Sequence, residues 1–259
     1  MAAASPLENA KKFIEEFDAL LVAQEKIDPF TEKARRAELL ASPTPLTHLA
    51  LSYLDAVSGK VEEALAYLRL ALEVNDVGLA YNYHHVLVNS CSYEELRAVS
   101  FKLADKYPCK AFSYNAYSLA YRYGERDRLE YYFDEHIKLL SEMEGRSKAM
   151  KHKDELLSEM DGVYDASKCS KDQFHILASI IWSLLSEHKA ATGFVSLSGR
   201  GSGCYIVDIR NLDSKSIAKM NFELADRVCA DERLDDCALV ARFSSPRQLH
   251  TGVTYSVGN

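Results

Sequence analysis

The chain has 259 residues, of which 47% are hydrophobic and 27% charged, with a formal net charge of -7 at pH 7. This composition is typical of a globular protein, and it excludes a disordered, collagen-like or membrane-spanning chain. The acidic balance disfavours general nucleic-acid binding, because an acidic chain gains nothing overall from the release of phosphate counterions. The length allows one large or two small domains.

The cysteines and the first residues indicate the cellular compartment. The six cysteines show no C-x-x-C spacing. We therefore expect reduced thiols packed as small hydrophobic residues, with no disulfide framework and no metal site. Residues 1–5 have neither a basic region nor a long apolar run, which predicts no signal peptide and no membrane anchor. Together these features favour a cytoplasmic protein that binds no membrane and carries no cofactor.

Helical periodicity dominates the first 141 residues. Apolar residues at helical spacing predict one helix before the Ile27-Asp28-Pro29 break, and seven helices after it. These seven helices are expected over 30–40, 46–57, 61–74, 78–90, 92–106, 111–123 and 126–141. The short turns between them favour antiparallel helix pairs.

One segment carries a family resemblance. Residues 59–76 read GKVEEALAYLRLALEVND, with Gly59 at a turn between helices and the small Ala64 and Ala71 where two helices would cross closely. This segment resembles the second half of a tetratricopeptide repeat. The tetrapeptide at 80–83 (Ala-Tyr-Asn-Tyr) returns as Ser-Tyr-Asn-Ala after 33 residues, at 113–116. The resemblance implies stacked helix pairs with a concave surface, although Leu96 and Leu129 depart from the small residues of the pattern.

The pattern changes towards the C-terminus. We expect a further helix over about 147–161 and then a linker through Asp165 and Ser167. After Ser170 the sequence predicts a helix to His188, strands at 193–197 and 204–210, a helix over 214–230 and strands at 237–243 and 253–257. The last 90 residues carry ten basic and ten acidic residues, so the whole net charge lies before them. The predicted fold class is α+β: a helical-repeat domain over 1–165 and a small α+β domain over 170–259, with a three- to four-stranded sheet.

A tyrosine cluster is the first candidate site. Ten of the fifteen tyrosines lie between positions 81 and 132. In stacked helix pairs the first helix of each pair lines the concave surface, and tyrosine suits a binding surface because it is large, rigid and amphipathic. The alternative is that these rings pack between helices in the core. The partner-binding set is expected to be Tyr81, Asn82, His85, Tyr114, Asn115, Ser118, Tyr121 and Arg122.

A glycine-rich loop between the two strands is the second candidate. It contains Gly199, Arg200, Gly201, Ser202 and Gly203. Backbone N–H groups of such a loop can hold a phosphate, and the arginine adds a charge. The loop is neither a P-loop nor a dinucleotide fingerprint, since a strand follows it. The alternative interpretation is a flexible hairpin turn.

No catalytic motif appears in the sequence. His84 and His85 are adjacent, so on a helix they point about 100° apart and cannot form the i, i+4 metal pair. We therefore expect no catalytic residues and no metal, in a non-enzymatic adaptor that binds another protein on its concave helical face. One alternative is an antitoxin- or immunity-type protein that neutralises a basic, nucleic-acid-directed enzyme. The other is a nucleotide-binding sensor or enzyme that uses the loop 199–203.

Overall fold

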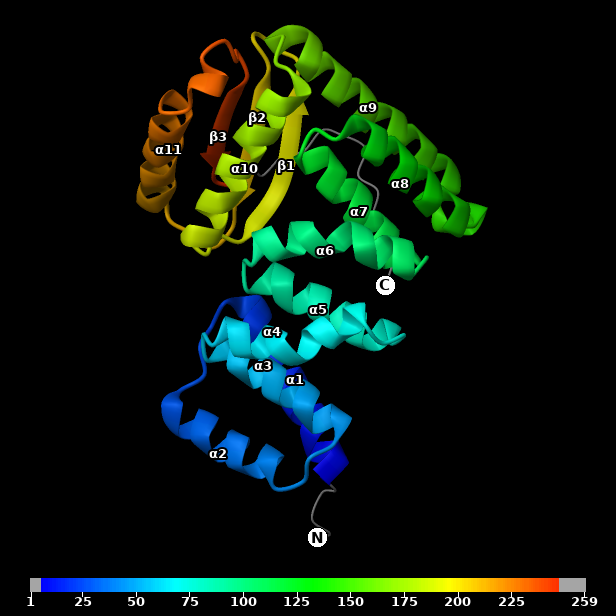
Figure 1. Ribbon diagram of the computed structural model, residues 1–259, viewed down its shortest axis with the longest axis vertical. Helices are drawn as coiled ribbons and strands as arrows, with labels where there is room; N and C mark the ends of the chain where they lie inside the picture. Colours follow the sequence, from blue (N-terminus) through cyan, green and yellow to red (C-terminus); the bar gives the residue numbers. More distant parts are fainter. Residues whose placement is uncertain (1–5, 247–259) are drawn as a thin grey trace. The chain divides into compact units, whose positions relative to one another are not determined.

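The computed structural model describes residues 6–246 (Figure 1). The chain forms two compact units, Met1–Leu96 and Arg97–Asn259. Eleven α-helices and one three-stranded sheet make up the described part, which confirms the α+β class. The division between the units falls inside helix α6 (Tyr93–Lys106), whereas the sequence indicated a division at 165–170.

The N-terminal unit is helical throughout. Side-chain caps begin three of its helices, because Asp28, Thr44 and Asp76 each accept a hydrogen bond from a backbone N–H of the first turn. The helix expected over 61–74 ends earlier and continues as a 3-10 turn, Arg69–Leu72, a common ending for an α-helix. The helices are α1 (Pro6–Ala23), α2 (Pro29–Leu40), α3 (Pro45–Val57), α4 (Val61–Leu68) and α5 (Val77–Asn89).

Helix α9 (Arg146–Ser167) corrects an expectation from the sequence. It is one continuous helix of 22 residues, so the expected linker at Asp165 and Ser167 is its last turn. Met160, Val163 and Ser167 are buried along one side of the helix, and its polar residues form the solvated side. The other helices of the C-terminal unit are α7 (Lys110–Arg122), α8 (Arg126–Leu139), α10 (Lys171–Glu187) and α11 (Ser214–Cys229).

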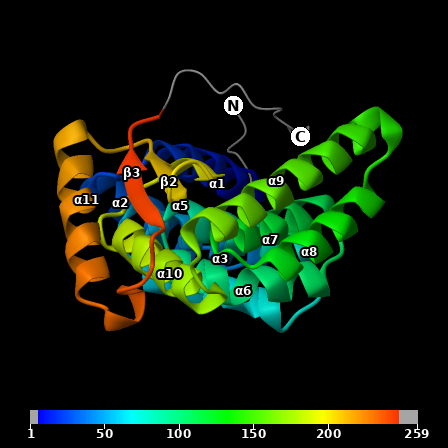
Figure 2. The same cartoon turned by 90° about the horizontal axis from the view of Figure 1, so that it is seen from above.

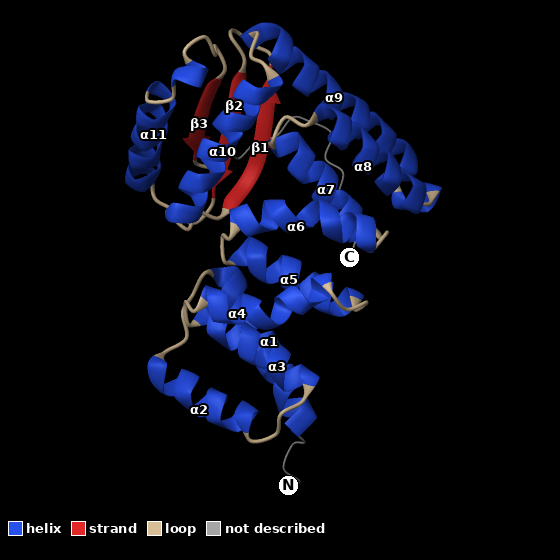
Figure 3. Ribbon diagram, in the orientation of Figure 1, coloured by secondary structure: helices blue, strands red, loops and turns tan. Residues whose placement is uncertain are grey.

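The sheet has the order β1 (Thr192–Ser198), β2 (Cys204–Ile209) and β3 (Val240–Ser244). Strands β1 and β2 form an antiparallel hairpin, and α11 connects β2 to the parallel β3. Helix α10 lies across one face of the sheet (Figures 1 and 2), where the rings of Phe174 and Tyr205 stack 5.6 Å apart. Figure 3 shows that all three strands belong to this one sheet. The strand expected at 253–257 lies outside the described residues.

Buried tyrosine hydroxyls join α7 to the sheet. The Tyr121 hydroxyl accepts from the Leu197 backbone N–H at 2.9 Å and donates to the Glu159 carboxylate at 2.6 Å. The Tyr205 hydroxyl donates to the Arg122 carbonyl oxygen at 2.6 Å. Burial raises the pKa of Tyr121 far above its usual value, so its hydroxyl stays protonated. These bonds place α7 and α9 in the same compact unit as the sheet.

Between residues 6 and 246, which include all six cysteines, no disulfide forms. Over the same range no helix has both the length and the apolar character needed to cross a bilayer.

Two glycines with left-handed backbone give a matched test of packing. Gly124 has φ +68°, and a Cβ atom there would lie 2.4 Å from Cδ1 of Phe174, a fully buried ring. Gly59 has φ +80°, and a Cβ atom there would meet nothing within 4 Å. We expect Gly59→Ala to lower the free energy of unfolding by about 1–2 kcal/mol through backbone strain alone. Gly124→Ala should cost about 1–3 kcal/mol more because of the clash. Urea unfolding of the two variants measures this difference, and equal losses would contradict the packing at Gly124.

Candidate functional site

The N-terminal unit contains an open hollow of about 310 Å³. Its walls come from α1, α3 and α5. Tyr81, Asn82 and His85 belong to the set expected from the sequence, whereas the α1 and α3 residues do not. The lining residues are Ile14, Glu15, Asp18, Tyr53, Tyr81, Asn82 and His85.

Two hydrogen bonds fix the floor of the hollow. Tyr53 is only 4% exposed, and its hydroxyl donates to Oδ1 of Asn82 at 2.8 Å. The amide nitrogen of Asn82 donates in turn to the Gly78 carbonyl oxygen at 2.7 Å. Burial, with a smaller contribution from the Asp18 charge, raises the pKa of Tyr53 well above its usual value. Tyr53 is therefore a neutral, oriented hydrogen-bond donor.

A histidine–carboxylate pair forms one side of the hollow. Nε2 of His85 lies 2.5 Å from Oδ1 of Asp18, and the imidazole stacks on the Tyr53 ring with 6.2 Å between centroids. In enzymes a carboxylate can orient a histidine that activates a neighbouring hydroxyl or thiol. The residues lining this hollow include no Ser, Thr or Cys. The His85–Asp18 pair therefore has no serine, threonine or cysteine beside it among the lining residues.

The charged groups that line the hollow are acidic. Glu15 and Asp18 contribute carboxylates, and no Lys or Arg is among the lining residues. Residues 1–96 contain 15 acidic and 8 basic residues, which leaves 23 of each in 97–259, so the N-terminal unit carries the entire net charge of -7. Tyr81, 43% exposed, presents an aromatic ring beside these carboxylates. Carboxylates next to tyrosine rings favour a cationic group.

The remaining residues of the expected groove belong to the C-terminal unit and differ in exposure. Tyr114 is 37% exposed, and Asn115 and Ser118 are half-buried. Tyr121 is 5% exposed, and its hydroxyl has two protein partners. The Arg122 guanidinium lies 5.2 Å from the centroid of the Trp182 ring. Tyr121 is therefore a packing residue of this unit and does not form part of a surface.

The glycine-rich loop packs against α9. A Cβ atom at Gly199 would lie 2.5 Å from the Gly162 carbonyl oxygen, and one at Gly203 would lie 3.2 Å from Cβ of Ser167. These two glycines allow close contact between the loop and the helix. Arg200, Gly201 and Ser202 remain exposed. The contact with α9 explains why positions 199 and 203 are glycines, and this explanation does not require a bound phosphate.

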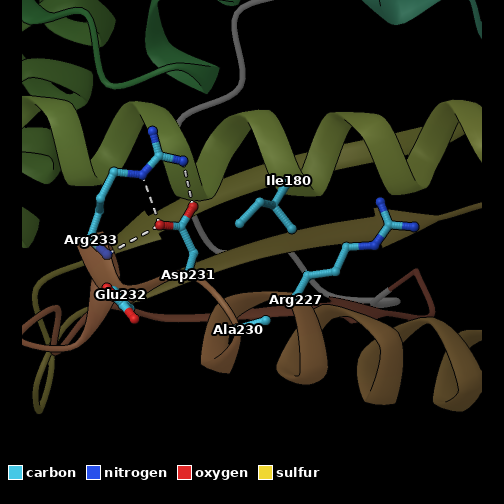
Figure 4. Close-up of a pocket in the computed structure, with 6 residues that line it drawn as sticks. All are labelled: Ile180, Arg227, Ala230, Asp231, Glu232 and Arg233. Carbon is cyan, nitrogen blue, oxygen red and sulfur yellow. Dashed lines mark hydrogen bonds and ion pairs between the residues drawn. The ribbon is translucent and has the colours of Figure 1, made fainter.

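A second hollow, of about 550 Å³, lies beside the C-terminal end of α11 and was not expected from the sequence (Figure 4). It contains two arginines, and both are paired. Arg227 forms two hydrogen bonds with Glu187, at 2.7 and 2.5 Å, and Arg233 forms two with Asp231, at 2.8 and 2.6 Å. Because carboxylates already compensate both guanidinium groups, this hollow offers an anion little uncompensated charge.

Comparison of this chain with known protein families, proteins and structures identifies no relatives. The chain matches no protein-family model, no curated protein and no solved structure. Within the described range, 6–246, no three His, Cys, Asp or Glu side chains gather to hold a metal ion. The tetratricopeptide resemblance therefore stays a prediction.

A buried histidine on α8 makes the stability of the fold depend on pH. His136 is fully buried, and its Nδ1 donates to the Lys110 carbonyl oxygen at 3.1 Å. Burial lowers the pKa of His136 to about 4. In the unfolded chain a histidine has a pKa of about 6.5, so on acidification the unfolded state takes up a proton before the folded state does. This contribution to stability is complete above about pH 6.5 and is lost as the pH falls towards 4.

We expect the free energy of unfolding to fall by about 2 kcal/mol between pH 8 and pH 5 through His136 alone. Urea unfolding of the wild type and of His136→Gln at both pH values isolates this contribution, because the other titrating groups are common to both proteins. The variant should lose less stability on acidification. An equal loss in the two proteins would contradict a neutral buried His136.

Proposed function

We propose that this protein is a non-enzymatic adaptor that binds a partner protein in the hollow of its N-terminal unit. The observation that supports this most strongly is the hollow in which Tyr53, Tyr81 and two carboxylates come together. The anchor from the partner is a lysine or arginine side chain. Its aliphatic stem would pack against Ile14 and Tyr81, and its charged end would lie near Glu15 and Asp18.

A cation–aromatic contact, preformed side-chain contacts and electrostatic steering would all favour such binding. A cation over an aromatic ring contributes about 0.5–1 kcal/mol at an exposed site and more where water is excluded. The hydrogen bond from Tyr53 to Asn82 and the contact of His85 with Asp18 exist before the partner arrives, so little ordering cost remains. The net charge of -7 in the N-terminal unit would steer a basic partner during encounter.

The same charge supports a second candidate function. An antitoxin- or immunity-type protein would use this acidic unit to cover the basic surface of a nucleic-acid-directed enzyme. The two functions differ in what the bound partner can still do. A neutralised enzyme would lose its affinity for nucleic acid on binding, whereas a partner held by an adaptor would keep its activity.

The proposed hollow can be tested without knowing the partner. Peptides displayed on phage are selected on the full chain, and the enriched peptides are titrated by calorimetry into the wild type, Tyr81→Ala and Tyr131→Ala. We expect enrichment of Lys or Arg next to aliphatic residues. We also expect Tyr81→Ala to weaken binding at least about tenfold, because truncation of a central aromatic contact typically costs more than 1 kcal/mol.

Tyr131 is the matched control, since it is 55% exposed and lies on α8 of the other unit. Its substitution should leave binding unchanged. Added salt should weaken the wild-type interaction, because exposed charges are screened. Enrichment of acidic peptides, or equal binding by the wild type and Tyr81→Ala, would reject the hollow as the binding site.

A further inference from the structure

Helix α2 exposes an apolar face to solvent. Phe30 is 84% exposed and Leu40 is 59% exposed. Ala34, Ala37 and Ala41 are also exposed. Ala41 is the C-cap residue and keeps helical backbone angles, so at 100° per residue the side chains at 30, 34, 37 and 41 form one stripe. We name these four residues, Phe30, Ala34, Ala37 and Ala41, the α2 stripe.

The opposite, charged side of α2 faces its own unit. Arg35 reaches Glu16 of α1 at 3.5 Å, and Arg36 reaches Asp55 of α3 at 2.5 Å. Leu39 is the single buried residue among the described positions of this helix. A surface helix normally buries its apolar side and exposes its charges. Helix α2, at one end of the N-terminal unit (Figure 1), has the reverse orientation, which leaves the stripe available for another helix.

The spacing of the stripe specifies a type of helix pairing. Its residues follow one another at intervals of four, three and four, the a and d positions of a heptad repeat. The three alanines let a second helix approach closely, and Phe30 supplies most of the apolar area. We propose that α2 pairs in parallel with α2 of a second copy of this chain.

Two charged residues beside the stripe favour α2 of a second copy as its partner, and they favour the parallel direction. Lys33 and Glu38 lie on opposite sides of the stripe, five residues apart. These are the g and e positions, and in a parallel pair Lys33 of each copy faces Glu38 of the other. In an antiparallel pair like edges meet, so the two charges would not face each other.

The surroundings of these two charges leave room for the contact. Lys33 is exposed and forms no ion pair within residues 6–246. Glu38 accepts from Asn9 through Oε1 at 2.7 Å, while its Oε2 lies 3.8 Å from Arg35. The Glu38 side chain is 43% exposed, so it remains accessible to a lysine of a second copy.

Helix α11 provides an internal comparison. Ala218, Phe222, Ala225 and Cys229 have the same spacing, and Phe222 is 75% exposed. The flanking positions that correspond to Lys33 and Glu38 are Asn221 and Asp226, which are not oppositely charged. Helix α11 therefore has the apolar stripe without the complementary charges, and Phe222 is a matched control for Phe30.

The stripe spans little more than three helical turns, so the expected dimer is weak. Sedimentation equilibrium of the full chain at up to about 1 mM detects such an association. We expect the wild type to dimerise and Phe30→Ser to weaken dimerisation at least about tenfold. Phe222→Ser should dimerise like the wild type. Circular dichroism confirms that the variants are folded, which the exposure of both phenylalanines leads us to expect.

Charge reversal tests the parallel register directly. Lys33→Glu alone and Glu38→Lys alone should each remain monomeric, because like charges then face each other along both edges of the pair. An equimolar mixture of the two variants should dimerise again, since both edges become complementary. A monomeric wild type at the highest concentration, loss of the dimer with Phe222→Ser, or a monomeric mixture would each overturn the proposal.

This inference is independent of the proposed adaptor function. No α2 residue lines the hollow of the N-terminal unit. The Phe30→Ser variant should therefore bind the selected peptides as the wild type does. Failure of the dimer would leave the hollow in place, and failure of peptide binding would leave the dimer in place.

Discussion

The C-terminal unit depends on the pairing of two buried tyrosine hydroxyls. A buried hydroxyl left without a partner costs about 1–3 kcal/mol, so each hydroxyl fixes the elements around it. Tyr121 on α7 accepts from the backbone of Leu197, 76 residues further along the chain. Tyr205 on β2 accepts from Trp182 and donates to the Arg122 carbonyl oxygen, 83 residues earlier. Helix α7 therefore reaches this packing only with the sheet in place, and the compact units divide at 96.

Tyrosines have two different structural roles in this chain. In the C-terminal unit Tyr121 is buried, so its ring is not accessible to a binding partner. In the N-terminal unit Tyr53 and Tyr81 line an open hollow beside carboxylates. The same unit carries the whole net charge and a helix whose apolar side faces solvent. The hollow beside carboxylates and the apolar stripe flanked by opposite charges therefore both lie in the first 96 residues.

Local signals predicted the helices and the strands at 193–197 and 204–210 well, and the helix expected after Ser170 begins there, with Ser170 and Gln173 forming a capping box. The linker predicted from the polar composition near Asp165 was wrong, because these polar residues lie on the solvated side of α9, whose other side is buried. The sequence placed Tyr121 in the expected partner-binding set, because no local signal indicates that its hydroxyl bonds to the backbone of Leu197 in the sheet. The hollow could not be predicted from local sequence, because Asp18 and His85, which are in contact, lie 67 residues apart in the chain. No local pattern around Asp18 indicates that contact.

We propose that the partner binds at the hollow and not along the tyrosines of α7. Photo-crosslinking tests it most directly, with p-benzoylphenylalanine placed at position 81 or at position 114 of the full chain. Mass spectrometry then identifies the segment that each position captures. If the partner binds at the hollow, position 81 captures a segment that contains Lys or Arg and position 114 captures none. Capture from position 114 alone would contradict it.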